Sequence, residues 1–325
     1  MPYEIKDNRF WEGKRYHSLD YELKNTFGKK LYKLSLNGGM SCPNRDGTIG
    51  TGGCIFCSKG GSGDFSPAAS IPVANQIEEA KKLVEKKLPY HHSTQYIAYF
   101  QAFTNTHAPV AYLERIFTEA IRHPDIAVLS IATRPDCLGE DVLSLLRRLH
   151  SIKPVWIELG LQTSHEDTAR WIRRGYELAV FEEAVGKLRL AGIPVIVHTI
   201  LGLPGESKDD ILKTMEYIGG LSDLGLIQGI KLQLMHILDG TELGRLYLED
   251  KLPECRAVLS MEDYISLVIS CLEHLPRELV IHRLTGDGPK EILLAPLWSG
   301  NKRLVLNTLH HTMKERDSWQ GKYYT

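Results

Sequence analysis

The stretch Asp125-Ile-Ala-Val-Leu-Ser-Ile-Ala132 decides the fold class of this chain. It is nearly continuous in apolar residues, which is typical of a strand covered on both faces. Amphipathic helix patterns stand on either side of it, over residues 109–121 and 139–150. A buried strand between two such helices predicts a parallel βαβ unit.

The same alternation of strand and helix recurs along the chain. We predict further strands at residues 31–36, 96–100, 155–159, 194–200, 229–235 and 278–283. We predict further helices at residues 74–88, 165–173, 178–190, 208–223, 242–249, 261–275, 288–296 and 300–314. This run of strand–helix units favours a full or partial α/β barrel over two separate domains. We expect an N-terminal extension over 1–30, the barrel over 31–285 and a C-terminal helical extension over 286–325.

A second stretch, Cys42-Pro-Asn-Arg-Asp-Gly-Thr-Ile-Gly-Thr-Gly-Gly-Cys54-Ile-Phe-Cys57, holds three of the six cysteines. Cys54 and Cys57 are close enough in sequence to bind one metal centre, and the glycine-rich loop lets Cys42 reach the same centre. A structural zinc normally takes four protein ligands, whereas three thiolates suit an iron–sulfur cluster with one open iron. The sequence therefore favours a cluster. It leaves open a zinc site completed by a distant His or Cys, or a chance grouping.

Polar or glycine-rich segments follow the carboxyl ends of the first five predicted strands. They are the cysteine loop and residues 101–106, 133–136, 160–163 and 202–206. The carboxyl ends of parallel strands meet at one rim of a barrel, which is where such barrels build their active sites. We therefore expect these segments to surround one candidate site.

Three further polar residues are candidates for that site. Arg173 ends a helix beside Arg174, and a guanidinium there can bind a carboxylate of cofactor or substrate; the alternative is a solvated face. His198 and Lys231 lie in predicted parallel strands, where a polar side chain must face the barrel interior or be hydrogen-bonded. We expect Lys231 to line the site and His198 to be a hydrogen-bonded core histidine.

Composition narrows the class of protein. The chain has 325 residues, of which 43% are hydrophobic and 24% charged, close to globular averages. Its formal net charge of −1 argues against a generally basic nucleic-acid coat, though not against a local basic patch. The start has no apolar signal region, no run reaches about 18 apolar residues, and clustered cysteines suit a reducing compartment. We expect a cytoplasmic protein with no membrane-spanning segment.

Both ends of the chain mix basic and aromatic residues. Residues 1–33 hold eight Lys or Arg against five Asp or Glu. Residues 298–325 hold five against two, together with four aromatic residues. Such segments can contact phosphates and stack on bases. The alternative is that both segments pack on the barrel and keep their charges in solvent.

Several motifs together carry a resemblance to a known family. They are Arg15-Tyr16 with Phe27-Gly28, the stretch from Cys42 to Cys57, Ser130–Asp136, Glu158–Thr163, Arg173-Arg-Gly175, His198 with Gly202-Leu-Pro-Gly-Glu206, and Gly240-Thr-Glu-Leu243. In this combination the chain resembles the radical S-adenosylmethionine (SAM) enzymes over about residues 10–310. Within them it is similar to the elongator-catalytic-subunit-like branch and to its bacterial MnmL (YtqA/YhcC) family. The cysteine spacing is longer than in most radical SAM enzymes.

The resemblance implies a fold and a set of cofactor ligands. The fold would be a partial parallel (β/α)6-type TIM-like barrel. Cys42, Cys54 and Cys57 would hold three irons of a [4Fe–4S] cluster whose fourth iron binds SAM. SAM would be cleaved to a 5′-deoxyadenosyl radical, while the barrel positions the reactants and excludes water. The residues implied in SAM binding are Gln101, Thr104, Thr133, Arg134, Glu158, Gln162, Gly202 and Gly205.

The resemblance also implies a substrate, the wobble uridine (U34) of tRNA. The enzyme would convert 5-carboxymethylaminomethyl(-2-thio)uridine to 5-aminomethyl(-2-thio)uridine, and the base would have to leave the anticodon stack. The implied partners are a tRNA anticodon loop, a reductant such as flavodoxin or ferredoxin, and a downstream methyltransferase. Two alternatives remain open. One is a radical SAM enzyme acting on a small metabolite or a protein, and the other is a non-enzymatic metal-binding module.

Overall fold

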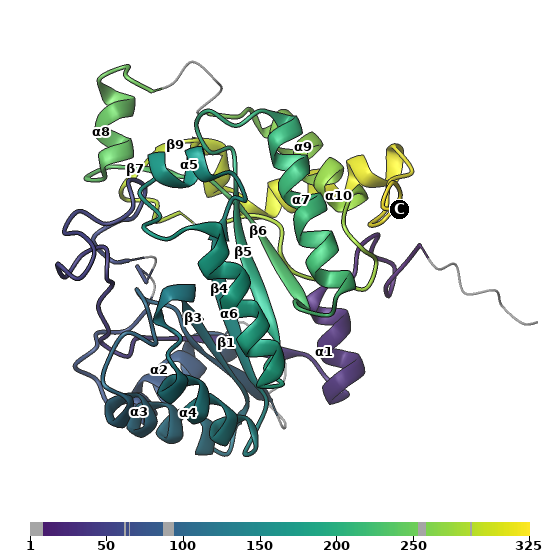
Figure 1. The fold of residues 1–325 in the computed structure, drawn as a ribbon. Coiled ribbons are helices and arrows are strands. Elements are labelled where there is room, and N and C mark those ends of the chain that lie inside the picture. The colour runs from purple at the N-terminus through teal and green to yellow at the C-terminus, as the bar shows by residue number, and fades with distance from the viewer. Residues whose placement is uncertain (1–8, 62, 65, 87–93, 253–257, 287) are drawn as a thin grey trace, which may run out of the picture.

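The fold is an α/β half-barrel. The computed structural model describes residues 9–61, 63–64, 66–86, 94–252, 258–286 and 288–325. Within them, seven parallel strands form one curled sheet in the order β1-β2-β3-β4-β5-β6-β8, and helices cover its outer face (Figure 1). The expected partial α/β barrel is therefore confirmed.

The strands of the main sheet are β1 (Leu31–Leu36), β2 (Gln95–Phe100), β3 (Ile126–Thr133), β4 (Val155–Gln162), β5 (Val195–Leu201), β6 (Gly229–Leu234) and β8 (Val280–Arg283). The helices are α1 (Leu19–Phe27), α2 (Val73–Glu85), α3 (Val110–Arg122), α4 (Glu140–His150), α5 (Glu166–Trp171), α6 (Leu178–Leu190), α7 (Lys208–Asp223), α8 (Glu242–Leu248), α9 (Met261–Glu273) and α10 (Lys302–Glu315). Two short 3₁₀ turns cover Pro135–Cys137 and Leu297–Gly300. None of the described helices has both the length and the apolar character needed to cross a membrane.

Strand β3 shows why the sequence folds this way. It pairs with β2 on one side and β4 on the other, and Val128, Leu129 and Ile131 are fully buried. Helix α3 covers this part of the sheet with Leu113 and Phe117, which are also fully buried. A strand buried on both faces needs apolar residues at consecutive positions, which is the pattern in the sequence.

The two ends of the chain meet at β8, the last strand of the sheet. Residues 17–18 run beside this strand, because Ser18 bridges Ile281 in parallel and the Ile281 N–H donates to the His17 carbonyl at 2.7 Å. The Gln320 side chain accepts from the His17 N–H at 2.8 Å and donates to the carbonyl of Leu279 at 2.8 Å. The outer edge of β8 is thereby covered.

One predicted element is wrong. Residues 288–296 do not form a helix; Leu293–Ala295 is strand β9, antiparallel to β7 (Ile237–Leu238). Pro289 and Pro296 bracket this segment, and a run this short gains more from pairing with a distant strand than from its own helical propensity. Helix α1 and strand β7 were not predicted as separate elements. The first lies in the N-terminal segment, and the second is only two residues long.

Candidate active site at the barrel mouth

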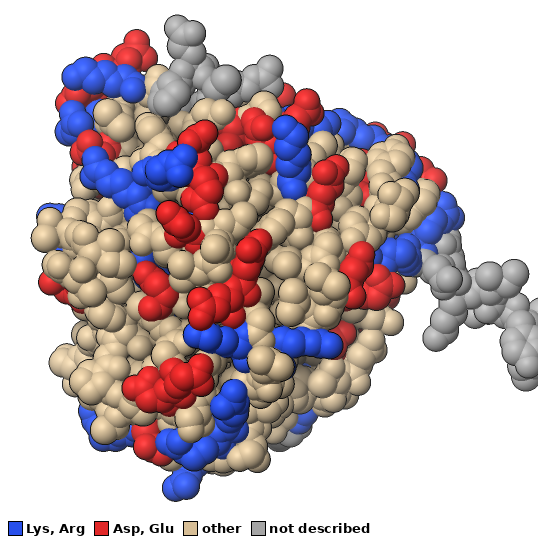
Figure 2. Space-filling model, in the orientation of Figure 1, with Lys and Arg blue, Asp and Glu red and all other residues tan. Residues whose placement is uncertain are grey.

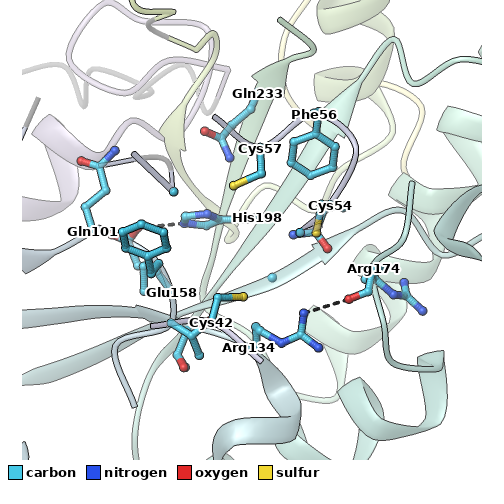
Figure 3. A pocket seen from close by; sticks show the side chains of 18 of the residues that line it. Cys42, Cys54, Phe56, Cys57, Gln101, Arg134, Glu158, Arg174, His198 and Gln233 are labelled. Atoms are coloured by element: carbon cyan, nitrogen blue, oxygen red, sulfur yellow. Dashed lines mark hydrogen bonds and ion pairs between the residues drawn. The ribbon is translucent and has the colours of Figure 1, made fainter. Parts of the chain in front are cut away.

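A cavity of about 170 Å³ opens at the carboxyl ends of the strands. Figure 3 shows the sulfur atoms of Cys42, Cys54 and Cys57 facing a common space above His198 and Glu158. Nine of the residues singled out in the sequence line this cavity: Cys42, Cys54, Cys57, Gln101, Thr104, Thr133, Arg134, Glu158 and Gln162. Four of the five expected strand-end segments therefore meet at this cavity, whereas residues 202–206 do not line it.

The cysteine loop is held in place by its own backbone and by Asn44. The N–H groups of residues 45 and 46 donate to the Cys42 carbonyl at 2.7 and 3.1 Å, which closes a tight turn. The Asn44 amide donates to Cys54 Sγ at 3.5 Å and to the Arg173 carbonyl at 2.8 Å. Gly175 has a positive φ of 82°, and a Cβ there would lie 2.4 Å from the Asn44 side chain. The glycine therefore lets the loop dock on the segment that follows α5.

The donor set of the three thiols suits an iron–sulfur cluster. Cys42, Cys54 and Cys57 all line one cavity, and thiolates hold such clusters. A structural zinc normally takes four protein ligands, whereas three thiolates leave one iron of a cluster open.

Burial keeps the thiols of Cys54 and Cys57 protonated until a metal binds. Desolvation, followed by the neighbouring Cys57, raises the pKa of Cys54 to about 12. Burial also raises the pKa of Cys57, although the nearby Arg45 guanidinium opposes the shift. A thiol is a good metal ligand only as the thiolate, so metal binding must displace protons here.

The floor of the cavity is a buried carboxylate surrounded by cations. Glu158 accepts from Lys33 Nζ at 2.6 Å, from Ser130 Oγ at 2.9 Å and from His198 Nε2 at 2.8 Å. It also contacts Lys231 Nζ, which donates to a tyrosine hydroxyl of β2 at 3.1 Å. The five residues come from β1, β3, β4, β5 and β6, so this cluster joins most of the barrel. We call these five residues the floor cluster.

The floor cluster carries a fixed charge pattern. Burial disfavours an ionised Glu158, but the charges of Lys231 and Lys33 outweigh it and hold the Glu158 pKa well below its usual value. Burial and then the charge of Lys231 lower the pKa of His198 to about 4. At neutral pH the floor therefore holds a carboxylate and a neutral imidazole. The expected hydrogen-bonded role of His198 is confirmed, and its ring also faces the cavity.

The third and fourth strand ends hold an arginine-rich wall. Arg134 donates to both oxygens of Asp136 at 2.9 and 2.6 Å and to the Arg174 carbonyl at 2.9 Å. The guanidinium groups of Arg134 and Arg174 each lie 4.8 Å from the centre of the Tyr176 ring. The Tyr176 hydroxyl donates to the Gln162 amide oxygen at 3.1 Å. Hydrogen bonds and cation–π contacts among these residues therefore hold the wall in place.

Four of the predicted residues are not among those that line the cavity. Arg173 is 56% exposed and pairs with Glu242 at 3.6 Å. Lys231 lies in the floor cluster below the cavity, fully buried. Gly202 and Gly205 lie in the turn after β5, and Gly202 borders a different hollow between α7 and α9.

Sequence reasoning missed several lining residues. They are Arg45, Tyr176, Gln233 and Arg283. Arg45 and Tyr176 stand next to motifs that were recognised, and that proximity was the available signal. Gln233 and Arg283 end β6 and β8, where the general rule that barrel sites form at strand ends applied equally.

Comparison with known proteins settles the family. The profile of the radical SAM superfamily matches residues 45–218, and that of the radical SAM C-terminal domain matches 227–315. The chain belongs to the radical SAM superfamily. It is therefore a radical SAM enzyme, and its family implies a [4Fe–4S] cluster and SAM as cofactors.

Three relatives of this radical SAM chain are informative. The protein YtqA of Bacillus subtilis (strain 168) is 44% identical over 311 residues, covering 96% of this chain and 93% of YtqA. The tRNA uridine(34) acetyltransferase of Methanocaldococcus jannaschii is 24% identical over 198 residues, covering 61% of this chain and 34% of that protein. The structure of Methanocaldococcus infernus Elp3 superposes with a TM-score of 0.66 at 14% identity, covering 89% of this chain and 64% of that one. The last comparison shows a shared fold.

Proposed function

We propose that this radical SAM enzyme modifies the wobble uridine of tRNA, converting 5-carboxymethylaminomethyl(-2-thio)uridine to the 5-aminomethyl form. The observation that carries the proposal is the cavity itself, where three clustered thiols stand beside four arginines, Arg45, Arg134, Arg174 and Arg283. A radical source beside cationic groups suits a substrate that bears a carboxylate. The similarity to a tRNA uridine(34) acetyltransferase supports a wobble-uridine substrate.

Within this proposal the chain's own residues have distinct roles. Cys42, Cys54 and Cys57 would hold the cluster, and when bound the cluster and SAM supply a carbon-centred radical that removes a hydrogen atom from a C–H bond. The polar residues of the cavity wall would orient SAM: Gln101, Thr104, Thr133, Arg134, Glu158 and Gln162. Lys231 would act as a positioning residue, because it contacts Glu158 from below. SAM contact by Gly202 and Gly205, and carboxylate binding by Arg173, stay predictions.

The net reaction balances with SAM as the oxidant. The N–CH2 bond of the carboxymethyl group is oxidised by two electrons, which SAM accepts with one proton to give methionine and 5′-deoxyadenosine. Water then releases the two carbons as glyoxylate and leaves the 5-aminomethyl base.

A local basic and aromatic surface supports RNA as the partner. Charges of both signs are interspersed over the face shown in Figure 2, so binding would need a local patch. Residues 9–17 and 302–325 pack together and hold eight Lys or Arg against three Asp or Glu. A hollow between them is lined by Phe10, Gly13, Lys14, Arg15, His310, Met313 and Lys314. Basic groups beside aromatic rings can contact phosphates and stack on bases.

The test is an anaerobic reaction with the reconstituted protein. It contains reductant (flavodoxin or ferredoxin, or a chemical one), SAM, and tRNA from cells that lack this enzyme. Nucleosides, 5′-deoxyadenosine and glyoxylate are measured by mass spectrometry. We expect the carboxymethylaminomethyl nucleoside to decline while the aminomethyl one, the substrate for a downstream methyltransferase, accumulates. Deoxyadenosine without any change in tRNA would contradict the proposal and favour a small metabolite or a protein as substrate.

A further inference from the structure

A second hollow of about 130 Å³ opens beside the first at the barrel mouth. The two hollows share five lining residues, which form their junction: Phe56, Cys57, Gln101, Gln233 and Arg283. The first hollow holds all three cysteines and the floor cluster residues Glu158 and His198, so the cluster and SAM belong there. The reacting carbon of the substrate must lie next to SAM. A substrate bound in the second hollow can reach SAM across the junction.

The second hollow has the character of a slot for a heterocyclic base. Its apolar wall comes from Ile200, Leu234, Met235, Leu238 and Pro289, and its polar groups include Asp64 and His236. The lining is about equally polar and apolar, so it offers apolar surface to the face of a ring and polar groups to its edge.

Two glycines fix the imidazole that lines this slot. A Cβ on Gly286 would lie 2.7 Å from the His236 ring, and a Cβ on Gly288 would lie 3.1 Å from it. The ring is therefore packed against both glycines, and any larger residue at Gly286 would displace it. A rigid ring is suited to form one side of a slot.

Arg283 is distinguished from the other arginines of the cavity by its place. Arg45, Arg134 and Arg174 line the first hollow and not the second. Arg283 ends β8 and lines both hollows.

We propose that the second hollow binds the flipped-out pyrimidine and that Arg283 binds its side-chain carboxylate at the junction. This inference rests on the proposed function and adds the recognition site. The methylene between nitrogen and carboxylate then lies on the side of the first hollow, where the radical is supplied. The aminomethyl product lacks the carboxylate, so Arg283 binds the substrate and releases the product.

The experiment measures binding of synthetic anticodon stem-loops to the reconstituted enzyme with SAM and no reductant. Three probes carry unmodified uridine, 5-carboxymethylaminomethyluridine or 5-aminomethyluridine at the wobble position. We expect wild type to bind the carboxymethylaminomethyl probe at least about tenfold more tightly than the aminomethyl probe, because a charge-assisted bond to a carboxylate is lost in the product. In Arg283→Gln this preference disappears, while affinity for the unmodified probe stays unchanged.

Two controls keep the result interpretable. Arg148→Gln removes an arginine from the exposed outer surface of α4, where it pairs with Glu114, and should keep the full preference. The iron content and the urea unfolding of Arg283→Gln should match wild type, which shows that the cluster and the fold are intact. A preference that survives in Arg283→Gln would overturn the inference and leave the proposed function standing. No preference in wild type, together with no conversion of tRNA, would refute the proposed function itself.

Discussion

The mouth and the floor of the barrel are both polar, yet they are built in opposite ways. The floor cluster is complete: Glu158 is bonded by Lys33, Ser130, His198 and Lys231 at once. The mouth above it holds the thiols of Cys54 and Cys57, whose pKa values are raised by burial, together with that of Cys42. The difference separates two tasks. The floor cluster stabilises the barrel, because its charged groups are paired with one another. The mouth carries the thiols that would hold the iron–sulfur cluster.

We expect the largest effect from a substitution of one cysteine in the mouth, which leaves the floor cluster intact. Cys54→Ser should reduce bound iron and 5′-deoxyadenosine formation to background, because a serine hydroxyl does not replace a thiolate ligand. The stability of the metal-free chain should change by less than about 1 kcal/mol, since the side chain keeps nearly its size. Iron content and urea unfolding measure the two effects. Cys271→Ser, in the buried core of α9, is the matched control and should keep its iron. Wild-type iron in Cys54→Ser would refute the assignment.

We expect the next largest effect from a substitution in the floor cluster, which should lower the free energy of unfolding. Glu158→Gln leaves Lys231, which is fully buried, without its counter-charge. We expect a loss of about 3–5 kcal/mol in the free energy of unfolding of the metal-free protein. Adding Lys231→Met should restore part of that loss, because it removes the unpaired charge. Urea denaturation of the single and double variants tests this. A single variant as stable as wild type would mean that the floor cluster does not hold the barrel together.

A pH titration separates His198 from Glu158. The folded-state pKa of His198 is about 4, below the ordinary value of about 6.5, so the unfolded chain binds more protons between these values. The free energy of unfolding should therefore fall as pH drops from about 6.5 to about 4, by up to ~3 kcal/mol. The depressed pKa of Glu158 acts lower, with stability lost only as pH falls below about 4.3. His198→Asn should reduce the slope in the first window, where the lowered pKa of the buried His282 keeps part of it, and should leave the second window unchanged. Equal slopes in both proteins would contradict this.

The smallest effect lies outside both regions, on the terminal surface. Replacing Lys14 and Lys314 by Gln should weaken tRNA binding a few-fold. A plot of the logarithm of the binding constant against the logarithm of the salt concentration should become less steep by about one unit per lysine. Substrate-free 5′-deoxyadenosine formation should not change, because neither residue lines the mouth. Lys187→Gln, on the exposed side of α6, is the control. An unchanged salt slope in the double variant would place RNA binding elsewhere.

Much of the fold follows from local pattern. The boundaries of β1, α6 and α7 were predicted to the residue, since each is bounded by clear turn or cap signals. Helix α7, for example, begins with Ser207 and Asp210 bonded to each other's backbone N–H. The pairing of β7 with β9 could not be predicted, because it joins short segments that are far apart in sequence and carry no periodic pattern.

The candidate site was predicted in part for a similar reason. The cysteines were found because ligand spacing is visible in sequence, and Glu158 was named through the family resemblance. The sequence did not show which of the two adjacent arginines, Arg173 or Arg174, lies in the cavity wall. Arg173 has a positive φ of 56°, which turns the chain so that Arg173 is exposed and Arg174 is buried in the wall. Such a turn depends on the docking of Asn44 onto this segment, which is a tertiary contact.

The hydrogen bonds of the Gln320 side chain have a consequence for synthesis of the protein. This one side chain bonds to residues 17, 276 and 279, and so fastens both ends of the chain beside β8. On the ribosome, strands β1 to β6 emerge long before residue 320 does. Until residue 320 has been synthesised, the outer edge of β8 lacks this cover, and an uncovered edge strand can pair with other chains.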